Sequence, residues 1–398
     1  MNSTKEIKVG IVRGNKIPEW ELPIYRSLKD HNIKPILIGT AIPTESNGAE
    51  FRRVRNIRGN RTLNKMFLSS GFGKMVRYGL DKNIQEYASK MFLWAKLFDG
   101  VDVLHLVDEA YYPSFQAMKK VKKSAMTVWE NIPYSFSIEK TAPTAKLKEK
   151  VFKQVDYFLP VSEEAKFSLL WQGIDESKIF KIHPGIDISK IRGRKENPSI
   201  YNTMKAPKDC TIILGVGRME YFKGLTYILR ALKKLKMESS KVKYFHLGSG
   251  NPKFSRYIMD MVKNLGLEDV FEILGSVRYS DIFDYYANAD LFLLPSITTM
   301  YWEEQMGFSI LEAMASGTIP IVSDIPTLEE VVPDDTGIRI PAGNADRLKE
   351  AINTFNEDKD SFSSMIKNGI QHVEDNYNSI KSAEQYSSIY RQLFSETR

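Results

Sequence analysis

The amino-acid sequence predicts an α/β protein with two doubly wound domains, each built on a parallel β-sheet. Short apolar runs alternate with longer helix-like stretches along most of the chain. These runs are continuous rather than alternating, which is typical of strands covered by helices on both faces of a parallel sheet. The series begins again near the middle of the chain, and 398 residues are many for one hydrophobic core.

The first half of the chain carries one such series. Its apolar runs predict strands at 7–12, 34–39, 101–107, 124–129, 156–161 and 178–182. Helical patterns lie between them, at 18–30, 81–98, 112–122 and 162–172. Ser162, followed by Glu163 and Glu164, predicts the start of the last of these helices. A serine caps N–H groups there, and acids favour the positive end of the helix dipole.

The second series follows the polar stretch 192–209, which we interpret as a linker. It predicts strands at 211–217, 243–248, 270–275, 290–295 and 318–323. Two series of five or six strands indicate two Rossmann-like domains, 1–191 and 210–377, facing one another across a central cleft. Ligands bind such sheets at the carboxyl ends of strands, so functional residues are expected just after strands.

Composition and charge narrow the class of protein. Cys210 is the only cysteine, which excludes an intramolecular disulfide and fits a reducing compartment. No apolar signal segment opens the sequence, and no run approaches the ~18 residues of a membrane span. We therefore expect a cytoplasmic protein. The net charge of +7 comes from a basic first half, which suggests an anionic partner.

The stretch "GVGRMEYFKGLTYILRAL" (215–232) is the first candidate site. A predicted strand ends in glycines at Gly215 and Gly217, and the loop after it carries Arg218 and Lys223 to the start of a helix. Two cations and a helix N-terminus after a parallel strand are suited to hold a diphosphate. The alternative is a glycine turn with two solvated cations.

The stretch "PSITTMYWEEQMGFSILEAMASG" (295–317) is the second candidate site. A loop carries Glu303 and Glu304 to Gly307, and the helix that follows contains Glu312. The two acids at 304 and 312 are placed to accept hydrogen bonds from the hydroxyls of a sugar and a ribose. Alternatively, one is a favourable N-terminal acid and the other a solvated helix residue. The N–H groups expected to point at a phosphate are those of Phe308, Ser309 and Ile310.

Together these stretches resemble the retaining glycosyltransferases of family 4, which have the GT-B fold. "GVGRMEYFKG" is similar to the family's donor-phosphate motif, and "EQMGFSILE" to its Glu-x7-Glu motif. "LPSI…EAMASGTIPIVSDI" and "IHPGID" (182–187) also follow the family's course. The resemblance implies that a nucleotide-sugar donor, UDP- or GDP-linked, is the substrate and that the last helix, about 378–398, crosses back onto the first domain.

The resemblance also implies roles for single residues. Arg218 and Lys223 would neutralise the diphosphate, Glu304 would hold the sugar and Glu312 the ribose. The "LGSV" turn, with Ser276 and Val277, would lie against the base. Glycines counted with the donor site are Gly14, Gly217 and Gly307. Retention would follow from same-face attack, with the departing phosphate oxygen taking the acceptor's proton.

The first half matches the family less well. After the first strand, where the family has a glycine-rich acceptor loop, this chain has only Gly14 in "VRGNKIPEW". Many relatives have a histidine after the strand at 124–129, and here Glu130 and Asn131 follow instead. Glu130 is a candidate polar contact or base. His105, on the preceding strand, is either a further catalytic candidate or a buried structural imidazole.

The acceptor is predicted less sharply. The stretch 51–78 is basic, contains no acid and is interleaved with apolar residues. It is either a surface for an anionic membrane and a lipid-linked acceptor, on the inner membrane face, or a solvated loop with a core-facing stripe. A glycan acceptor is equally compatible. No nucleic-acid motif accompanies the charge.

No metal or other cofactor is expected, because the five histidines are scattered and the only Asp-x-Asp, at 358–360, lies in a polar helical stretch. Two other functions stay open. One is a hydrolase or epimerase that acts on a nucleotide-sugar with the same fold. The other is a non-catalytic nucleotide-sugar binding protein.

Overall fold

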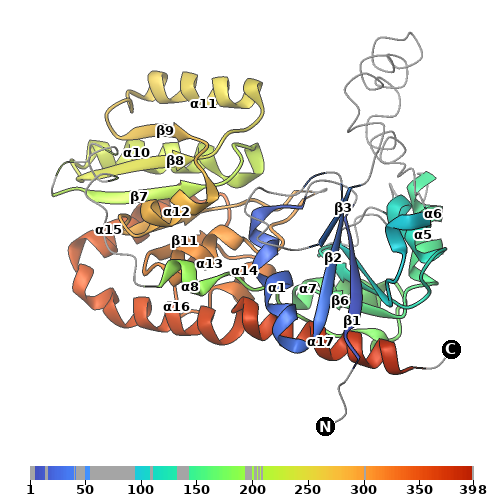
Figure 1. Ribbon diagram of the computed structural model, residues 1–398. Coiled ribbons are helices and arrows are strands. Elements are labelled where there is room, and N and C mark those ends of the chain that lie inside the picture. The colour runs from blue at the N-terminus through green and yellow to red at the C-terminus, as the bar shows by residue number, and fades with distance from the viewer. Residues whose placement is uncertain are drawn as a thin grey trace. The chain divides into compact units, whose positions relative to one another are not determined.

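The computed structural model describes most of the chain, in two compact units. The described residues are 5–13, 17–39, 41, 50–53, 95–107, 111–131, 143–192, 200, 204, 207, 209–299 and 302–396. Unit 1 is Met1–Gly185 with Ser379–Arg398, and unit 2 is Ile186–Asn378 (Figure 1). Each unit is built on one six-stranded sheet.

Unit 1 has a parallel sheet with the strand order β3-β2-β1-β4-β5-β6. The strands are β1 Ile7–Arg13, β2 Ile33–Gly39, β3 Glu50–Arg53, β4 Val103–Val107, β5 Ser124–Val128 and β6 Tyr157–Pro160. The strand order reverses between β1 and β4, which is the switch point where ligands bind in doubly wound sheets.

The helices of unit 1 include one from the far end of the chain. They are α1 Leu22–Ser27, α5 Tyr111–Met118, α6 Pro143–Phe152, α7 Glu163–Trp171 and α17 Ser379–Ser395. Short 3₁₀ turns are η1 Glu19–Glu21, η2 Leu28–His31, η3 Ala95–Phe98 and η5 Glu176–Lys178. Tyr386, Ile389, Tyr390 and Leu393 of α17 are buried in the core formed with β1 and α1. The predicted return of the last helix is confirmed.

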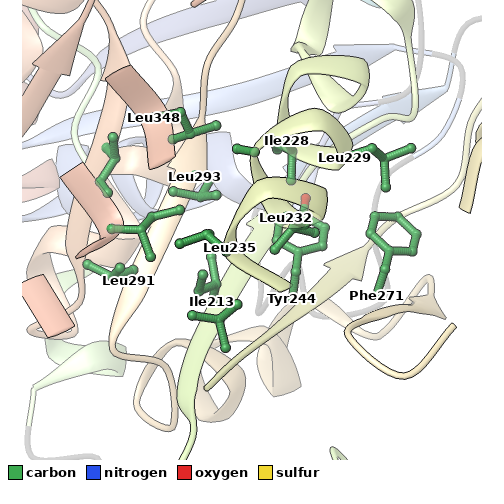
Figure 2. Close-up of a cluster of buried hydrophobic side chains, with 14 of the residues drawn as sticks. Ile213, Ile228, Leu229, Leu232, Leu235, Tyr244, Phe271, Leu291, Leu293 and Leu348 are labelled. Atoms are coloured by element: carbon green, nitrogen blue, oxygen red, sulfur yellow. The ribbon is translucent and has the colours of Figure 1, made fainter. Parts of the chain in front are cut away.

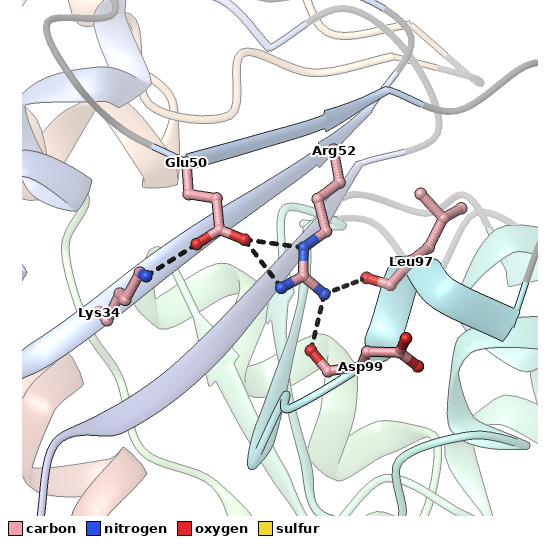
Figure 3. Close-up of polar contacts among 5 residues, drawn as sticks. All are labelled: Lys34, Glu50, Arg52, Leu97 and Asp99. Carbon is pink, nitrogen blue, oxygen red and sulfur yellow. Dashed lines mark hydrogen bonds and ion pairs between the residues drawn. The ribbon is translucent and has the colours of Figure 1, made fainter.

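The edge strand β3 was missed because it has only four residues and three of them are charged. Arg52 donates to the carbonyl oxygens of Leu97 and Asp99, both at 2.9 Å, and pairs with Glu50 (Figure 3). Glu50 in turn binds Lys34 of β2 at 2.9 Å. Arg52 therefore links the backbone on either side of 54–94, a stretch that lies outside the described residues together with most of the predictions for 51–78 and 81–98.

Unit 2 repeats the parallel architecture with the strand order β12-β11-β10-β7-β8-β9. The strands are β7 Thr211–Val216, β8 Val242–Leu247, β9 Phe271–Gly275, β10 Leu291–Leu294, β11 Ile319–Ser323 and β12 Ile338–Ile340. The helices are α8 Ile188–Ile191, α10 Leu225–Met237, α11 Pro252–Leu265, α12 Tyr279–Tyr286, α13 Phe308–Ala315, α14 Pro326–Val331, α15 Ala345–Glu357 and α16 Ser363–Asn376. Two 3₁₀ turns are η6 Tyr221–Lys223 and η7 Lys359–Phe362. The switch point lies between β7 and β10.

The core of unit 2 shows why helix and sheet form together. Along α10, Ile228, Leu229, Leu232 and Leu235 recur at the spacing of one helix face and are buried. Figure 2 shows these side chains beside Ile213, Tyr244 and Leu293 of the sheet. This packing fixes the ends of the strands and thereby the loops that follow them.

Two sequence predictions differ from the structure. The run 178–182 is not a strand, since Ile179 forms only an isolated bridge with Phe158. The segment is a loop whose apolar side chains pack inward. In the sequence, this gives the same short apolar run as a buried strand. The chain also enters unit 2 earlier than the stretch 192–209, because the N–H group of Ile186 donates to the carbonyl of Tyr377 at 2.8 Å.

Candidate functional site

The loops after β7 and β10 of unit 2 meet at the switch point. The N–H group of Ile297 donates to the carbonyl of Phe222 at 2.8 Å. Gly224 has a φ of +76°, and a Cβ atom there would lie 2.0 Å from the carbonyl oxygen of Pro295. Only glycine allows this close approach, so the residue between Lys223 and α10 joins the two candidate loops.

We expect Gly224→Ala to separate these loops and to destabilise unit 2. Gly266→Ala is a matched control, since Gly266 has a φ of +63° and open space around it. The control should cost about 1–2 kcal/mol of unfolding free energy, and Gly224→Ala about 2 kcal/mol more, because its methyl group meets backbone. Urea unfolding measures both values, and equal losses would contradict this contact.

Lys223 and Glu304 form an ion pair at this junction. Lys223 Nζ lies 2.6 Å from Glu304 Oε2, and the hydroxyl of Ser296 donates to the same oxygen at 2.9 Å. The side chain of Glu304 is 8% exposed and that of Lys223 is 16% exposed. The structure thus brings together one predicted residue from each motif, although they are far apart in sequence.

Trp302 and Glu303 lie in the second candidate stretch, but no role was predicted for either residue. The ring of Trp302 stacks on Phe222 at 3.9 Å between centroids, and Lys223 Nζ lies 5.0 Å from the Trp302 ring. Glu303 accepts hydrogen bonds from Thr298 at 3.2 Å and from Thr327 of α14 at 3.0 Å. An unusual aromatic residue beside two acids at a strand's carboxyl end was the signal available in the sequence.

Glu312 is buried inside α13 rather than solvated. Tyr279 donates a hydrogen bond to its Oε1 at 2.7 Å, and Tyr286 donates to its Oε2 at 3.1 Å. Burial raises the pKa of Glu312 from 4.5 to about 7, against the two hydrogen bonds, which lower it. The two tyrosines fix the orientation of the carboxyl group, and its ionisation is sensitive to pH near neutrality.

This pKa predicts a pH dependence of stability. Between about pH 4.5 and about pH 7, folded Glu312 keeps a proton that the unfolded chain releases. The free energy of unfolding should therefore fall as pH rises through this window, by about 3 kcal/mol in all, and then level off. Urea unfolding of the wild type and of Glu312→Gln across the window isolates the effect. A constant difference between the two proteins would exclude it.

Gly307 caps the start of α13 with a φ of +66°, a left-handed conformation that favours glycine, and a Cβ atom there would also crowd Ile310 Cδ1 at 2.6 Å. The N–H group of Ile310 donates to the carbonyl of Gly307 at 2.7 Å. This bond engages one of the three N–H groups predicted to face a phosphate. The other two belong to Phe308 and Ser309, which are both half-buried.

The glycine loops after β7, β8 and β9 lie together. A Cβ atom on Gly248 would lie 2.0 Å from the carbonyl oxygen of Gly217, which also accepts a hydrogen bond from Nε2 of His246 at 3.1 Å. Burial lowers the pKa of His246 to about 4, so its imidazole is neutral. The "LGSG" turn after β8 was not predicted as part of the site, although glycines at a strand's carboxyl end were a signal for it.

Arg218 and Ser276 are the exposed members of the predicted donor site. Arg218 lies on the loop that leads from β7 to Lys223. Ser276 donates a hydrogen bond from its hydroxyl to that of Ser249 at 3.2 Å, which ties the turn after β9 to the loop after β8. Val277 is half-buried next to it.

In unit 1, Glu130 directly follows β5 and forms a buried ion pair. Lys148 Nζ of α6 lies 2.9 Å from Glu130 Oε1 and 2.6 Å from Oε2, and the two side chains are 2% and 7% exposed. Next to it, Asn131 accepts a hydrogen bond from Ser162 at 3.0 Å. The sequence predicted Glu130 at the carboxyl edge of the sheet, but it did not predict its cationic partner.

His105 lies inside β4 and is 1% exposed. Its Nε2 is 2.6 Å from the hydroxyl of Thr127, and its Nδ1 is hydrogen-bonded to the hydroxyl of Tyr390 on α17. Burial lowers its pKa to about 3, so the imidazole is neutral. This setting fits the buried structural imidazole of the two sequence alternatives.

Gly14 lies outside the described residues, but its neighbour Arg13 ends β1 beside a polar and aromatic cluster. Arg13 forms an ion pair with Glu21, and its guanidinium lies 5.9 Å from the ring centroid of Trp20. Trp20 meets Trp129 edge to face at 5.9 Å. The carboxyl ends of β1 and β5 therefore carry charged and aromatic side chains in one place.

Within the described ranges, no group of three or more His, Cys, Asp or Glu side chains is arranged to hold a metal ion. In the same part of the chain, none of the helices combines the length and the apolar character needed to cross a bilayer.

Comparison with known sequences finds a family match within unit 2. Residues 199–372 match the family described as glycosyl transferases group 1. The chain is 29% identical over 236 residues to a putative colanic acid biosynthesis glycosyltransferase of Escherichia coli K12, covering 58% of this chain but only 55% of that one. It is 25% identical over 374 residues to an uncharacterized glycosyltransferase of Methanocaldococcus jannaschii, covering 91% and 90% of the two chains.

Solved structures show the same fold at low sequence identity. A glycosyltransferase of Rickettsia africae superposes with a TM-score of 0.73 at 20% identity, over 99% of this chain and all of that one. Anabaena HepE, crystallised with UDP and glucose, gives a TM-score of 0.74 at 15% identity, over 97% and 100%. Together with the two parallel sheets, these likenesses establish the two-domain, Rossmann-like GT-B fold.

Proposed function

We propose that this chain is a retaining glycosyltransferase that moves a hexose from a nucleoside diphosphate sugar to an acceptor hydroxyl. The observation that carries the proposal is the meeting of Lys223 and Glu304, at 2.6 Å, where the loops after β7 and β10 join beside the start of α13. A cation, a carboxylate and a helix N-terminus at a switch point match the phosphate and hydroxyl groups of such a donor.

Each side chain then has a role. Lys223 and Arg218 bind the diphosphate, and the N-terminus of α13 at Gly307 adds its dipole. Glu304 accepts hydrogen bonds from the sugar. Glu312, set by two tyrosines, accepts from the ribose hydroxyls. The turn at Ser276 and Val277 lies against the base, for which uridine and guanosine are the first candidates.

The proposed reaction breaks the anomeric C–O bond, and the nucleoside diphosphate leaves with the bonding electrons. The acceptor oxygen bonds to the anomeric carbon from the same face. Its proton passes to the departing phosphate oxygen, so charges balance without an enzyme nucleophile. Because negative charge grows on the leaving group, most of the catalysis comes from cations already in place. We propose that turnover requires neither a metal ion nor another cofactor.

The acceptor is proposed to engage the carboxyl edge of the unit 1 sheet. Glu130, fixed by Lys148, is the candidate polar contact for the attacking hydroxyl, and it is the alternative proton acceptor if the phosphate oxygen does not take the proton. A lipid-linked acceptor presented at an anionic membrane is proposed from the basic sequence 51–78 alone. A soluble glycan is the other acceptor class that the sequence allows.

Radiolabelled donors test the proposal. The full-length protein is incubated with UDP-, GDP- and ADP-hexoses, with and without a mixture of glycan and lipid-linked acceptors, in EDTA. We expect labelled product that depends on the acceptor. Labelled sugar or an epimer formed without acceptor would indicate a hydrolase or epimerase. Donor that is bound but unchanged would indicate a binding protein.

A further inference from the structure

An aromatic pair joins the two loops that carry Lys223 and Glu304, and none of the proposed roles uses it. Phe222 immediately precedes Lys223, and Trp302 lies two residues before Glu304. Their rings stack at 3.9 Å with an interplanar angle of 26°. The backbone link from Ile297 to Phe222, at 2.8 Å, lies in the same junction. The pair is therefore part of the contact that brings the two motifs together.

Hydrogen bonds hold the backbone carbonyl of Trp302 and the side chain of the next residue, Glu303. Its carbonyl oxygen accepts hydrogen bonds from the N–H group of Thr299 at 2.8 Å and from the Thr299 hydroxyl at 3.2 Å. The next residue, Glu303, is bound by the hydroxyls of Thr298 and Thr327. These bonds hold the backbone at Trp302, and the stack on Phe222 orients its ring, so the indole presents a surface to a neighbouring cation.

The ammonium of Lys223 has two neighbours of different kinds. It lies 2.6 Å from a carboxylate oxygen of Glu304 and 5.0 Å from the centroid of the Trp302 ring. An ammonium within about 6 Å of an indole face is attracted by the electrons of the ring. When a sugar binds, its hydroxyls compete with Lys223 for the Glu304 carboxylate. The face of the Trp302 ring forms no hydrogen bonds, so the sugar hydroxyls do not compete for it.

We propose that Trp302 is a positioning residue, which keeps the Lys223 ammonium in the diphosphate site when a phosphate draws it away from Glu304. The inference rests on the proposed function. Without donor, Lys223 and Glu304 satisfy one another. With donor, phosphate oxygens approach Lys223 and sugar hydroxyls approach Glu304, so the ion pair opens. The indole face is the neighbour that Lys223 retains through this exchange, which limits the freedom of its long side chain.

Nucleotide pairs that differ by one phosphate measure this role. The probes are UDP with UMP, GDP with GMP and ADP with AMP, and the pair that the wild type binds most tightly is used. The readout is the ratio of the two dissociation constants, which reports the interaction with the second phosphate. In Trp302→Leu this preference for the diphosphate should fall about fivefold, while monophosphate binding stays the same.

Three further variants serve as controls for Trp302→Leu. Trp302→Phe keeps an aromatic face and should retain most of the preference. Lys223→Ala should give the lowest preference for the diphosphate, since it removes the ammonium itself. Tyr257→Leu is a control for loss of an aromatic ring from the unit 2 surface, as Tyr257 is 52% exposed on α11. It should leave both dissociation constants unchanged.

Each other outcome has a definite meaning. If Trp302→Leu weakens the binding of the diphosphate and the monophosphate by the same factor, or changes neither, Trp302 does not position Lys223 and the inference fails. If Lys223→Ala also leaves the preference intact, the proposed donor site fails with it. If the wild type binds none of the probes, both proposals fall.

Discussion

Lys223→Ala is expected to lower turnover with a nucleoside diphosphate sugar by about a hundredfold or more. The leaving group gains negative charge as the anomeric bond breaks, and Lys223 is the half-buried cation at the junction of the two loops, with a side chain that is 16% exposed. A preorganised cation acts more strongly in such a setting than in water, because few water molecules screen it. Initial rates at saturating donor give the effect on kcat.

Two variants control this measurement. Lys223→Arg keeps the charge but changes its shape and reach, so it should recover only part of the rate. Lys263→Ala removes an exposed lysine from α11 of the same unit and should leave kcat unchanged. A thermal unfolding curve shows whether each variant is folded. Near-normal turnover of folded Lys223→Ala would mean that the diphosphate binds elsewhere.

The second large effect is expected in unit 1, where Lys148→Met should cost about 3–5 kcal/mol of unfolding free energy. The substitution leaves the Glu130 carboxylate at 2% exposure without the ammonium that lies 2.6 and 2.9 Å from its oxygens. An uncompensated buried charge is far less favourable than either the pair or an apolar substitute. Urea unfolding followed by far-UV circular dichroism measures the loss.

The double variant Glu130→Gln/Lys148→Met separates charge from packing. It removes both charges and should recover most of the lost stability. Lys153→Met is the matched surface control, because Lys153 pairs with Glu149 where both side chains are largely exposed. It should change stability little. A small loss in Lys148→Met would mean that water or another neighbour compensates the charge of Glu130. A stable but inactive double variant would assign Glu130 to the acceptor reaction.

Strands covered on both faces were the most predictable part of the fold. β1, β2, β4 and β5 are continuous apolar runs whose side chains are almost all buried, so the pattern in the sequence is also the pattern of burial. The edge strands β3 and β12 have four and three residues and contain arginine. Only pairing with a neighbouring strand defines them, and that information is not local.

The residues of the candidate site also differ in how far they could be predicted from the sequence. Lys223, Glu304 and Glu312 were predictable because loops after parallel strands and helix starts are recognisable one at a time. Trp302, Tyr279 and Lys148 were not, since each matters through a partner that is brought near by packing. Tyr279, for example, reaches Glu312 across 33 positions of sequence. Residue type alone does not distinguish such a tyrosine from one that only fills a core.

The bond between His105 and Tyr390 spans 285 positions of sequence, and α17 completes the core of unit 1. During translation, therefore, unit 1 leaves the ribosome first but lacks α17 until unit 2 has been synthesised. Until α17 is made, the apolar side chains of unit 1 that pack against it lack that cover. A chain cut before α17 would leave unit 1 in that uncovered state, because Tyr386, Ile389, Tyr390 and Leu393 would be missing from its core.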